Sequence, residues 1–330
     1  MTIIETAAPP DVVVPPPPVG RRVVRLPGSP KILLGLGMLL FFVLLAVIGP
    51  LLAPQDPTAT TVDLLQGPSG AHWLGTTQSG QDVLSQLLVG ARSTVLIGFL
   101  AGTIATVLSV VVGISAGYFG GLTDDLLSML TNVFLVIPGL PLLIVLAAYL
   151  PSGTGSNPFV IALIVSVTGW AWGARVLRAQ TLSLRRRDYV ASAQVIGERP
   201  LRIIGAEILP NLTAIVASSF VFTVLYAIGT FVALAFLGVV DPSHWSWGSM
   251  LFWAESQNAA QVNAWWWFLP PGFAIALLGT SLALLNFGID EFINPRLRAA
   301  GLTRRTARAA GMPRRIRFGM TPRINRETAR

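Results

Sequence analysis

The sequence has no cysteine and little charge, and both shortages narrow the kinds of protein it can encode. Without cysteine, the chain forms neither a disulfide framework nor a thiolate metal site. Charged residues make up 12% of the chain and hydrophobic residues 53%, whereas soluble domains carry roughly 25% charged residues. The mean hydropathy is +0.67. This composition indicates a membrane protein with several spans.

Lysine and histidine are almost missing as well. Lys31 is the single lysine, and because Ile32 follows it, the phosphate-binding pattern G-x-x-x-x-G-K-[ST] is excluded. His72 and His244 lie far apart, so no metal cluster is predicted. The apolar runs carry no paired carboxylates, which disfavours a proton-driven carrier. We therefore predict no catalytic, cofactor-binding or metal-binding residue in this chain. These observations do not exclude a membrane channel as its function.

Long hydrophobic runs are the main feature that is present. A helix needs about 20 mostly apolar residues to cross the hydrocarbon core of a bilayer. Six runs approach or exceed this length: residues 32–52, 94–118, 126–150, 159–176, 212–237 and 266–285. The runs are too long for barrel strands, which are short and alternate in polarity. The sequence predicts an all-α polytopic membrane protein with six transmembrane helices.

Basic residues give the orientation of these helices, because cytoplasmic loops are enriched in Lys and Arg. Twenty-two of the 23 basic residues lie before the first run, between residues 175 and 202, or after the sixth run. Residues 151–158 and 239–265 contain none. We therefore expect both termini and the segment 185–211 on the cytoplasmic side.

The chain divides into four parts by composition. Residues 1–29 are proline-rich and are predicted to be a disordered cytoplasmic N-terminus. Residues 30–91 hold the first span and an external loop, and residues 92–290 hold the core with the segment 185–211. Residues 291–330 form a basic cytoplasmic tail, for which we expect attraction to anionic lipids rather than nucleic-acid binding.

The segment 185–211, RRRDYVASAQVIGERPLRIIGAEILPN, is too polar to span a membrane but has helical periodicity. Its apolar residues predict one short helix up to Gly197, then a turn and a second helix that stops before Pro210. The first helix would project small side chains on the cytoplasmic side: Ala191, Ser192 and Ala193. Two interpretations remain open, namely docking into a groove of another protein and lying on the lipid surface.

Polar and aromatic residues in the spans are candidates for a translocation pathway. Asn132 interrupts the third run, although an interhelical hydrogen bond also explains such a residue. We place Trp170 and Trp172 of the fourth run on the pathway with it. The tryptophans at 265–267 fit an interfacial belt, with the outer mouth of a pathway as the alternative.

The segment 185–211 resembles the cytoplasmic coupling loop, or EAA loop, of the permease subunits of bacterial ABC importers. Ala191, Ser192 and Ala193 stand at the Glu-Ala-Ala positions, and the first two differ from that pattern. The spacing of thirteen residues from Gly197 to Pro210 is retained. The resemblance implies that the ATPase-coupling residues are Tyr189, Ala191, Ser192, Ala193, Gly197, Leu209 and Pro210.

Four further segments resemble one branch of this family, the oligopeptide/dipeptide/nickel permeases, and specifically the second of their two permease subunits. They are residues 72–92, 117–125, 234–251 and 287–298. Thr77 and Gln81 stand where Asp and Arg are common, and Phe231 replaces a usual Glu. The resemblance extends over about residues 30 to 298.

The resemblance implies a type I ABC importer fold in the bacterial inner membrane and a defined set of partners. These partners are a homologous second permease, an extracytoplasmic solute-binding protein and two cytoplasmic ATPases that bind ATP and Mg. We expect peptides as the solute, because no His or Met cluster suggests a metal route. Oligosaccharides or nickel are the alternative solutes, and a non-translocating assembly or receptor subunit is the alternative function.

Overall fold

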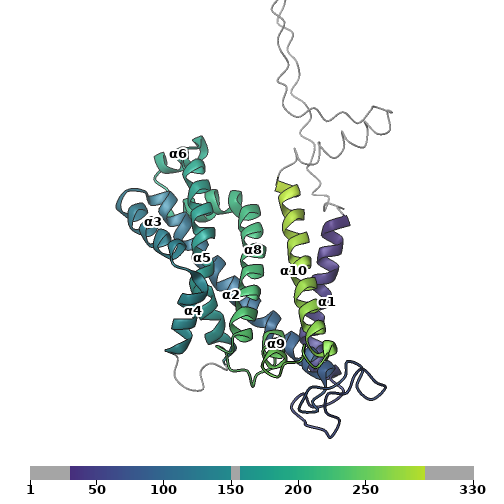
Figure 1. Cartoon of the computed structure of the whole chain (residues 1–330). Coiled ribbons are helices and arrows are strands. Elements are labelled where there is room, and N and C mark those ends of the chain that lie inside the picture. Colours follow the sequence, from purple (N-terminus) through teal and green to yellow (C-terminus); the bar gives the residue numbers. More distant parts are fainter. Residues whose placement is uncertain (1–29, 150–156, 294–330) are drawn as a thin grey trace, which may run out of the picture.

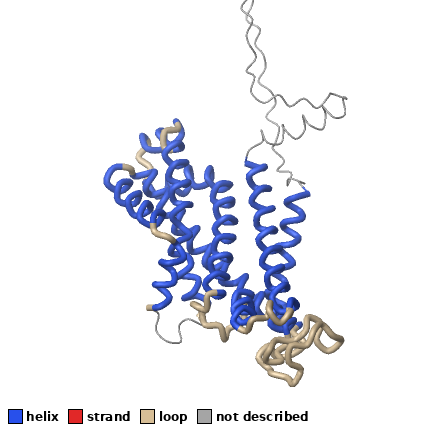
Figure 2. Tube along the Cα trace, in the orientation of Figure 1, coloured by secondary structure: helices blue, strands red, loops and turns tan. Residues whose placement is uncertain are grey.

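The computed structural model describes residues 30–149 and 157–293, and every regular element within these ranges is a helix (Figures 1 and 2). The expected disorder of residues 1–29 and the tail from residue 294 lie outside the described residues. The elements are α1 (Pro30–Leu52), α2 (Val83–Phe119), α3 (Gly121–Val136), α4 (Gly139–Ala148), α5 (Pro158–Leu184), α6 (Asp188–Val195), α7 (Pro200–Ile203), the π-helical turn η2 (Ile204–Ile208), α8 (Leu209–Phe236), α9 (Trp247–Ser256) and α10 (Trp265–Ile293).

The predicted six spans correspond to five long helical stretches and one bent pair. Five stretches among the described residues are long and apolar enough to cross a bilayer. Helices α3 and α4 together form a sixth candidate span if the pair is counted as one. The two helices are bent by 91° relative to each other. The break falls at Pro138, where Ile137 takes the extended backbone that a residue before proline prefers. The third span is therefore broken at its proline.

Helix α2 is the centre of the bundle and begins earlier than predicted, at Val83 instead of residue 94. Asp82 caps it by accepting a hydrogen bond from the backbone N–H of Ser85. Glycines let α8 and α5 approach closely: a Cβ on Gly102 would lie 2.5 Å from a Val224 methyl, and one on Gly113 would lie 2.5 Å from the Ala174 carbonyl oxygen. These glycines therefore serve packing within the chain.

The bundle has two ends with different elements (Figure 1). Helix α6 and the beginning of α1 lie at one end, which we call the α6 end. Helix α9 and the loop of residues 53–82 lie at the other, which we call the α9 end. Helices α1 and α10 pack side by side.

The tryptophans near the start of α10 do not form the belt that the sequence suggested. Trp265 is exposed, but Trp266 donates from Nε1 to the backbone oxygen of Thr76 at 3.2 Å. Trp267 is 1% exposed and belongs to the core. The prediction was wrong for Trp266 and Trp267 because the loop of residues 53–82 packs over this end of α10.

Candidate functional site

A glycine turn joins α6 to α7 as the sequence predicted. Gly197 has a φ of +82°, in the left-handed region that favours glycine. Its N–H donates to the oxygen of Gln194 at 3.1 Å, and the N–H of Glu198 donates to the oxygen of Ala193 at 3.1 Å. These two bonds are the pattern of a Schellman motif, which satisfies the last carbonyl groups of a helix. The turn is thus a defined structure rather than a slack connection.

One face of α6 is buried against the chain itself. Val190 and Ala193 pack in a cluster with Ile203 and Ile208 from the next elements and with the ends of the long helices. The partners from α2, α5 and α8 are Ile114, Tyr118, Leu177 and Leu212. The prediction that Ala193 projects outward was therefore wrong, because this small residue lets α6 lie close to the bundle. Helix α6 is fixed to three long helices through this cluster.

The opposite face of the pair carries apolar side chains without cover from the described residues. Val195 is 87% exposed, Ile196 81% and Leu201 80%. Ala191 and Ser192 are exposed beside them, and Tyr189 is partly exposed. We call the exposed set the α6–α7 surface: Ala191, Ser192, Val195, Ile196 and Leu201. Large apolar side chains exposed together on two neighbouring helices are typical of an interaction site.

Basic side chains surround the α6–α7 surface. Arg186, Arg187, Arg199 and Arg202 are all exposed at this end of the bundle. Arg202 pairs with Glu198 at 3.3 Å, one helical turn away. Positive charge beside an apolar patch suits either an acidic rim on a partner protein or lipid headgroups. The basic residues therefore do not distinguish a partner protein from lipid, and a test must change the apolar side chains instead.

Leu209 and Pro210 lie in a continuous helix, which corrects the predicted stop before Pro210. The helical stretch runs from Pro200 to Phe236, and Leu209 is the first residue of α8. The N–H of Leu209 bonds to the oxygen of Ile204, five residues back, as in a π-helical turn. Because the regular ladder is already interrupted there, the missing N–H of Pro210 breaks little more of it. Leu209 packs against the buried cluster of α6, and Pro210 is exposed.

An ion pair holds the beginning of α3 to α5 near the α6 end. Arg178 donates from Nη2 to Asp124 Oδ2 at 2.7 Å and also from Nε to Oδ1. The hydroxyl of Ser128 donates to Asp124 as well, at 2.9 Å. A two-bonded guanidinium–carboxylate contact fixes orientation as well as distance. Helices α3 and α5 therefore have a defined relative position beside α6.

The three predicted pathway residues separate into two environments. Trp170 is buried and contacts Phe134 edge-on, with ring centroids 5.3 Å apart. Trp172 is half exposed and packs against Phe222, with ring centroids 4.9 Å apart. Asn132 is exposed and accepts a hydrogen bond from Arg175 at 2.5 Å. The structure thus leaves Trp172 and Asn132 accessible and places Trp170 inside the chain.

Arg175 is a site residue that sequence reasoning assigned only to orientation. It lies three residues after Trp172, so the two side chains share one face of α5. Its side chain is exposed, and with Asn132 and Arg178 it lines a hollow of about 360 Å³ between α2, α3 and α5. An arginine facing lipid inside a span is costly. This face of α5 therefore fits water or a partner protein better than lipid. The sequence signal that could have identified Arg175 was an arginine inside a predicted span.

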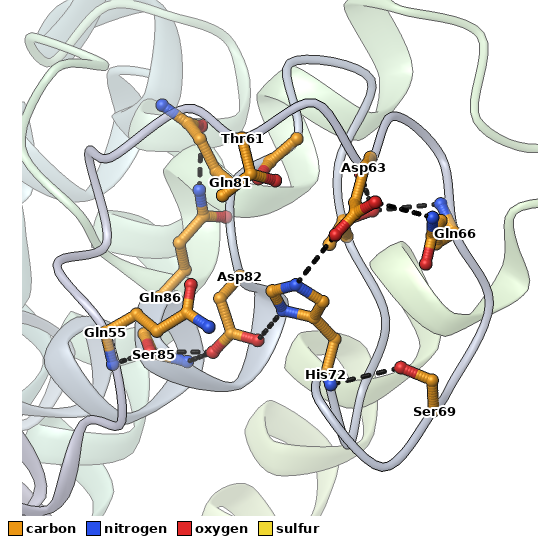
Figure 3. Close-up of polar contacts among 12 residues, drawn as sticks. Gln55, Thr61, Asp63, Gln66, Ser69, His72, Gln81, Asp82, Ser85 and Gln86 are labelled. Carbon is orange, nitrogen blue, oxygen red and sulfur yellow. Dashed lines mark hydrogen bonds and ion pairs between the residues drawn. The ribbon is translucent and has the colours of Figure 1, made fainter.

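The loop at the α9 end is tied to the beginning of α2 by a buried histidine (Figure 3). Nδ1 of His72 lies 3.0 Å from Asp82 Oδ1, and Nε2 lies 3.8 Å from Asp63 Oδ2. Asp82 Oδ2 accepts from the hydroxyl of Ser85 at 2.7 Å. The loop of residues 53–82 is therefore an ordered part of the bundle and not a mobile connection.

A second turn at this end stands between α8 and α9. The hydroxyl of Ser243 donates to Asp241 Oδ1 at 2.7 Å, and the backbone N–H of Ser243 donates to the same oxygen at 3.0 Å. These two hydrogen bonds hold the pKa of Asp241 below its usual value. The carboxylate therefore stays ionised and keeps the turn closed at neutral pH.

Comparison with known proteins assigns this arrangement to a family. The family described as the binding-protein-dependent transport system inner membrane component matches residues 109–299. Residues 29–68 match the N-terminal TM domain of oligopeptide transport permease C. The chain belongs to the permease subunits of binding-protein-dependent ABC importers. The resemblance to this family of permeases is confirmed, as is the all-α type I importer fold.

Relatives of this permease match over most of their length. It is 32% identical to the dipeptide transport system permease protein DppC of Bacillus subtilis over 277 residues, which is 83% of this chain and 84% of that protein. It is also 32% identical to the oligopeptide transport system permease protein OppC of Mycobacterium tuberculosis, over 79% of this chain and 89% of that one. The OppC of Bacillus subtilis is 29% identical, over 84% and 89%. This permease is therefore similar to both named kinds of peptide permease.

Proposed function

We propose that this permease forms half of the translocation pathway of an importer for short peptides, dipeptides or oligopeptides. A homologous second permease forms the other half, and an extracytoplasmic binding protein delivers the solute. Two cytoplasmic ATPases bind ATP and Mg and supply the energy, so this chain has no catalytic role of its own. The relatives named for dipeptide and oligopeptide transport support the peptide assignment over oligosaccharides or nickel.

The exposed α6–α7 surface is the observation that carries the proposal. Its apolar side chains are exposed, while the opposite face of α6 is packed onto α2, α5 and α8. A partner that grips Val195, Ile196 and Leu201 therefore moves these helices together with α6. When ATP closes the ATPase dimer, such a movement would shift the spans between inward-open and outward-open states. A helix that only lay on lipid would not need this rigid attachment.

The proposal also sets the orientation of this permease in the plasma membrane. The basic residues of the segment 185–202 lie at the α6 end, which makes that end cytoplasmic by the positive-inside rule. The α9 end then faces the binding protein. Both termini would be cytoplasmic, since α1 begins and α10 ends at the α6 end.

Replacing Val195 with Asp tests the coupling role directly. The side chain is exposed, so the change costs this chain little stability. A charge at the centre of a buried interface should weaken ATPase binding by about thirtyfold. This corresponds to a loss of roughly 2 kcal/mol of binding free energy, the value typical of a central interface side chain. The measurement is co-purification of the ATPases with the membrane subunits, with and without the variant.

Val62→Asp is the matched control, because Val62 is 94% exposed at the α9 end. It should leave the ATPases bound. Full recovery of the ATPases with Val195→Asp would contradict the coupling role and favour the lipid-lying helix or a non-translocating subunit.

A further inference from the structure

Two neighbouring hollows share part of helix α3. The first has a volume of about 360 Å³, lies between α2, α3 and α5, and contains Arg175; we call it the Arg175 hollow. The second has a volume of about 560 Å³, is lined by α3 and Ile137, and contains Asp125; we call it the Asp125 hollow. Ser128 and Asn132 line both hollows. The two hollows therefore adjoin along one face of α3.

A polar stripe follows this face of the otherwise largely apolar helix. Asp125, Ser128 and Asn132 stand at positions i, i+3 and i+7, so their side chains lie on one side of α3. Because an α-helix rises about 1.5 Å per residue, Asp125 and Asn132 are about 10 Å apart along its axis. Arg175 reaches the Asn132 end of the stripe, where it donates to Asn132 Oδ1 at 2.5 Å. A cationic and an anionic side chain therefore stand at the two ends of one polar face.

Neither Arg175 nor Asp125 has an ion-pair partner in the described part of the chain. The ion pairs found there involve other residues. Arg178, by contrast, is held by two hydrogen bonds to Asp124, and Asp125 acts on Arg178 only through space. The side chains of Arg175 and Asp125 are both exposed. Both are therefore accessible to a ligand that carries the opposite charges.

A zwitterion of suitable length would satisfy both side chains. A guanidinium binds a carboxylate through two parallel hydrogen bonds, and the contact with Asn132 holds the guanidinium of Arg175 in place. The carboxylate of Asp125 would accept hydrogen bonds from an ammonium group. A free peptide carries these two groups at its opposite ends, and an extended tripeptide covers about 10 Å.

Other solutes fit these two hollows less well. A neutral sugar would leave both charged side chains without a partner. A metal ion would meet a single carboxylate, that of Asp125, among the residues that line the two hollows, whereas metal sites use several ligands. The charges therefore favour a free peptide over either alternative.

We propose that Arg175 binds the C-terminal carboxylate of the transported peptide and that Asp125 binds its N-terminal ammonium group. This inference rests on the proposed function, because it names the groups by which this permease recognises a peptide. Asp125 lies near the beginning of α3, close to the α6 end, so the ammonium group would lie nearer the cytoplasm (Figure 1). This mode of binding makes no demand on the side chains of the peptide. A carboxylate of the second permease and a lipid phosphate are the competing partners of Arg175.

The test measures binding of radiolabelled trialanine to the assembled transporter in lipid nanodiscs by equilibrium dialysis, without the binding protein. Unlabelled trialanine, its C-terminal amide and its N-acetyl form are the competitors. We expect saturable binding of trialanine. The amide and the acetyl form should each bind about tenfold more weakly, the effect of losing one hydrogen bond between charged groups.

Two variants assign the two ends of the peptide. Arg175→Leu should weaken binding of trialanine about tenfold and leave the affinity for its amide unchanged, so that the two bind equally. Asp125→Asn should remove the difference between trialanine and its acetyl form in the same way. Both side chains are exposed, so these changes cost the permease little stability. Arg92→Leu and Glu255→Gln are the matched controls and should preserve both differences, because these exposed residues line neither hollow.

Three results would overturn the proposal. They are the absence of saturable trialanine binding, an affinity for trialanine that Arg175→Leu or Asp125→Asn leaves unchanged, and an equal loss of affinity for trialanine and its amide in Arg175→Leu. An unchanged affinity in Arg175→Leu would assign this arginine to the second permease or to lipid.

ATP-driven peptide uptake is measured separately in proteoliposomes, which distinguishes this inference from the proposed function. Peptide uptake without saturable trialanine binding would reject the inference and leave the proposed function intact. The absence of peptide uptake would reject the proposed function itself.

Discussion

Gly197 is the residue whose conformation determines how α6 is presented. A Cβ at this position would meet nothing within 4 Å, so the requirement for glycine comes from the φ of +82° and not from space. A β-branched residue in this region costs on the order of 1–3 kcal/mol, whereas asparagine enters it more easily.

Gly197→Val should therefore displace α6, while Gly197→Asn should preserve it. We expect the valine variant to insert and to pair with its partner permease, but to lose stimulation of ATP hydrolysis by solute-loaded binding protein. The asparagine variant should retain most of the stimulation. ATPase activity of the purified complex, with and without loaded binding protein, provides the comparison. Equal stimulation in both variants would show that the turn geometry does not matter.

The residues of the coupling segment also show the limit of a local pattern. The helical spacing and the glycine predicted α6, the turn and the start of the second helix correctly. The exposure of Ala193 was mispredicted because its burial depends on Ile203, Ile208 and Leu212, which approach only after the chain folds back. The exposure of Val195 and Ile196 was missed for a different reason, because apolar residues on a short helix are expected to be buried.

At the scale of elements, apolar runs predicted which helices exist more reliably than where they begin and end. Helix α2 starts eleven residues before its predicted boundary, since its first turns carry polar residues that pack against the loop at the α9 end. The break between α3 and α4 falls at Pro138, inside a single apolar run. The predicted helix end before Pro210 was wrong. The π-helical turn that accommodates this proline could not be inferred from the sequence.

Helix α5 has a face that the described residues leave uncovered, and Arg175 makes this face testable. Arg175→Leu should reduce peptide uptake severalfold, because the guanidinium that orients Asn132 and faces the hollow is lost. Arg175→Lys should retain more uptake, since it keeps the positive charge. Membrane yield and ATPase recovery should stay normal in both. Uptake by Arg175→Leu at the level of the unmodified permease would place this face away from the pathway.

At the scale of the whole molecule, the two ends of the bundle should face opposite sides of the membrane. Reporter fusions after Asn157 and Asn258 should report an external location, and fusions after Arg187 and Arg298 a cytoplasmic one. This result follows from the concentration of basic residues near the α6 end. A cytoplasmic signal at Asn258 would contradict the six-span arrangement, including the counting of α3 and α4 as one span.

The whole assembly works as proposed only if energy from the ATPases drives peptides through the two permeases. The most direct measurement is uptake of a labelled dipeptide and a labelled oligopeptide into proteoliposomes that contain both permeases, the ATPases and the binding protein. We predict accumulation that needs ATP and loaded binding protein and that is strongly reduced by Val195→Asp in this permease. Uptake of sugars alone would contradict the peptide assignment, and peptide uptake that persists without ATP or is undiminished with Val195→Asp would contradict the coupling account.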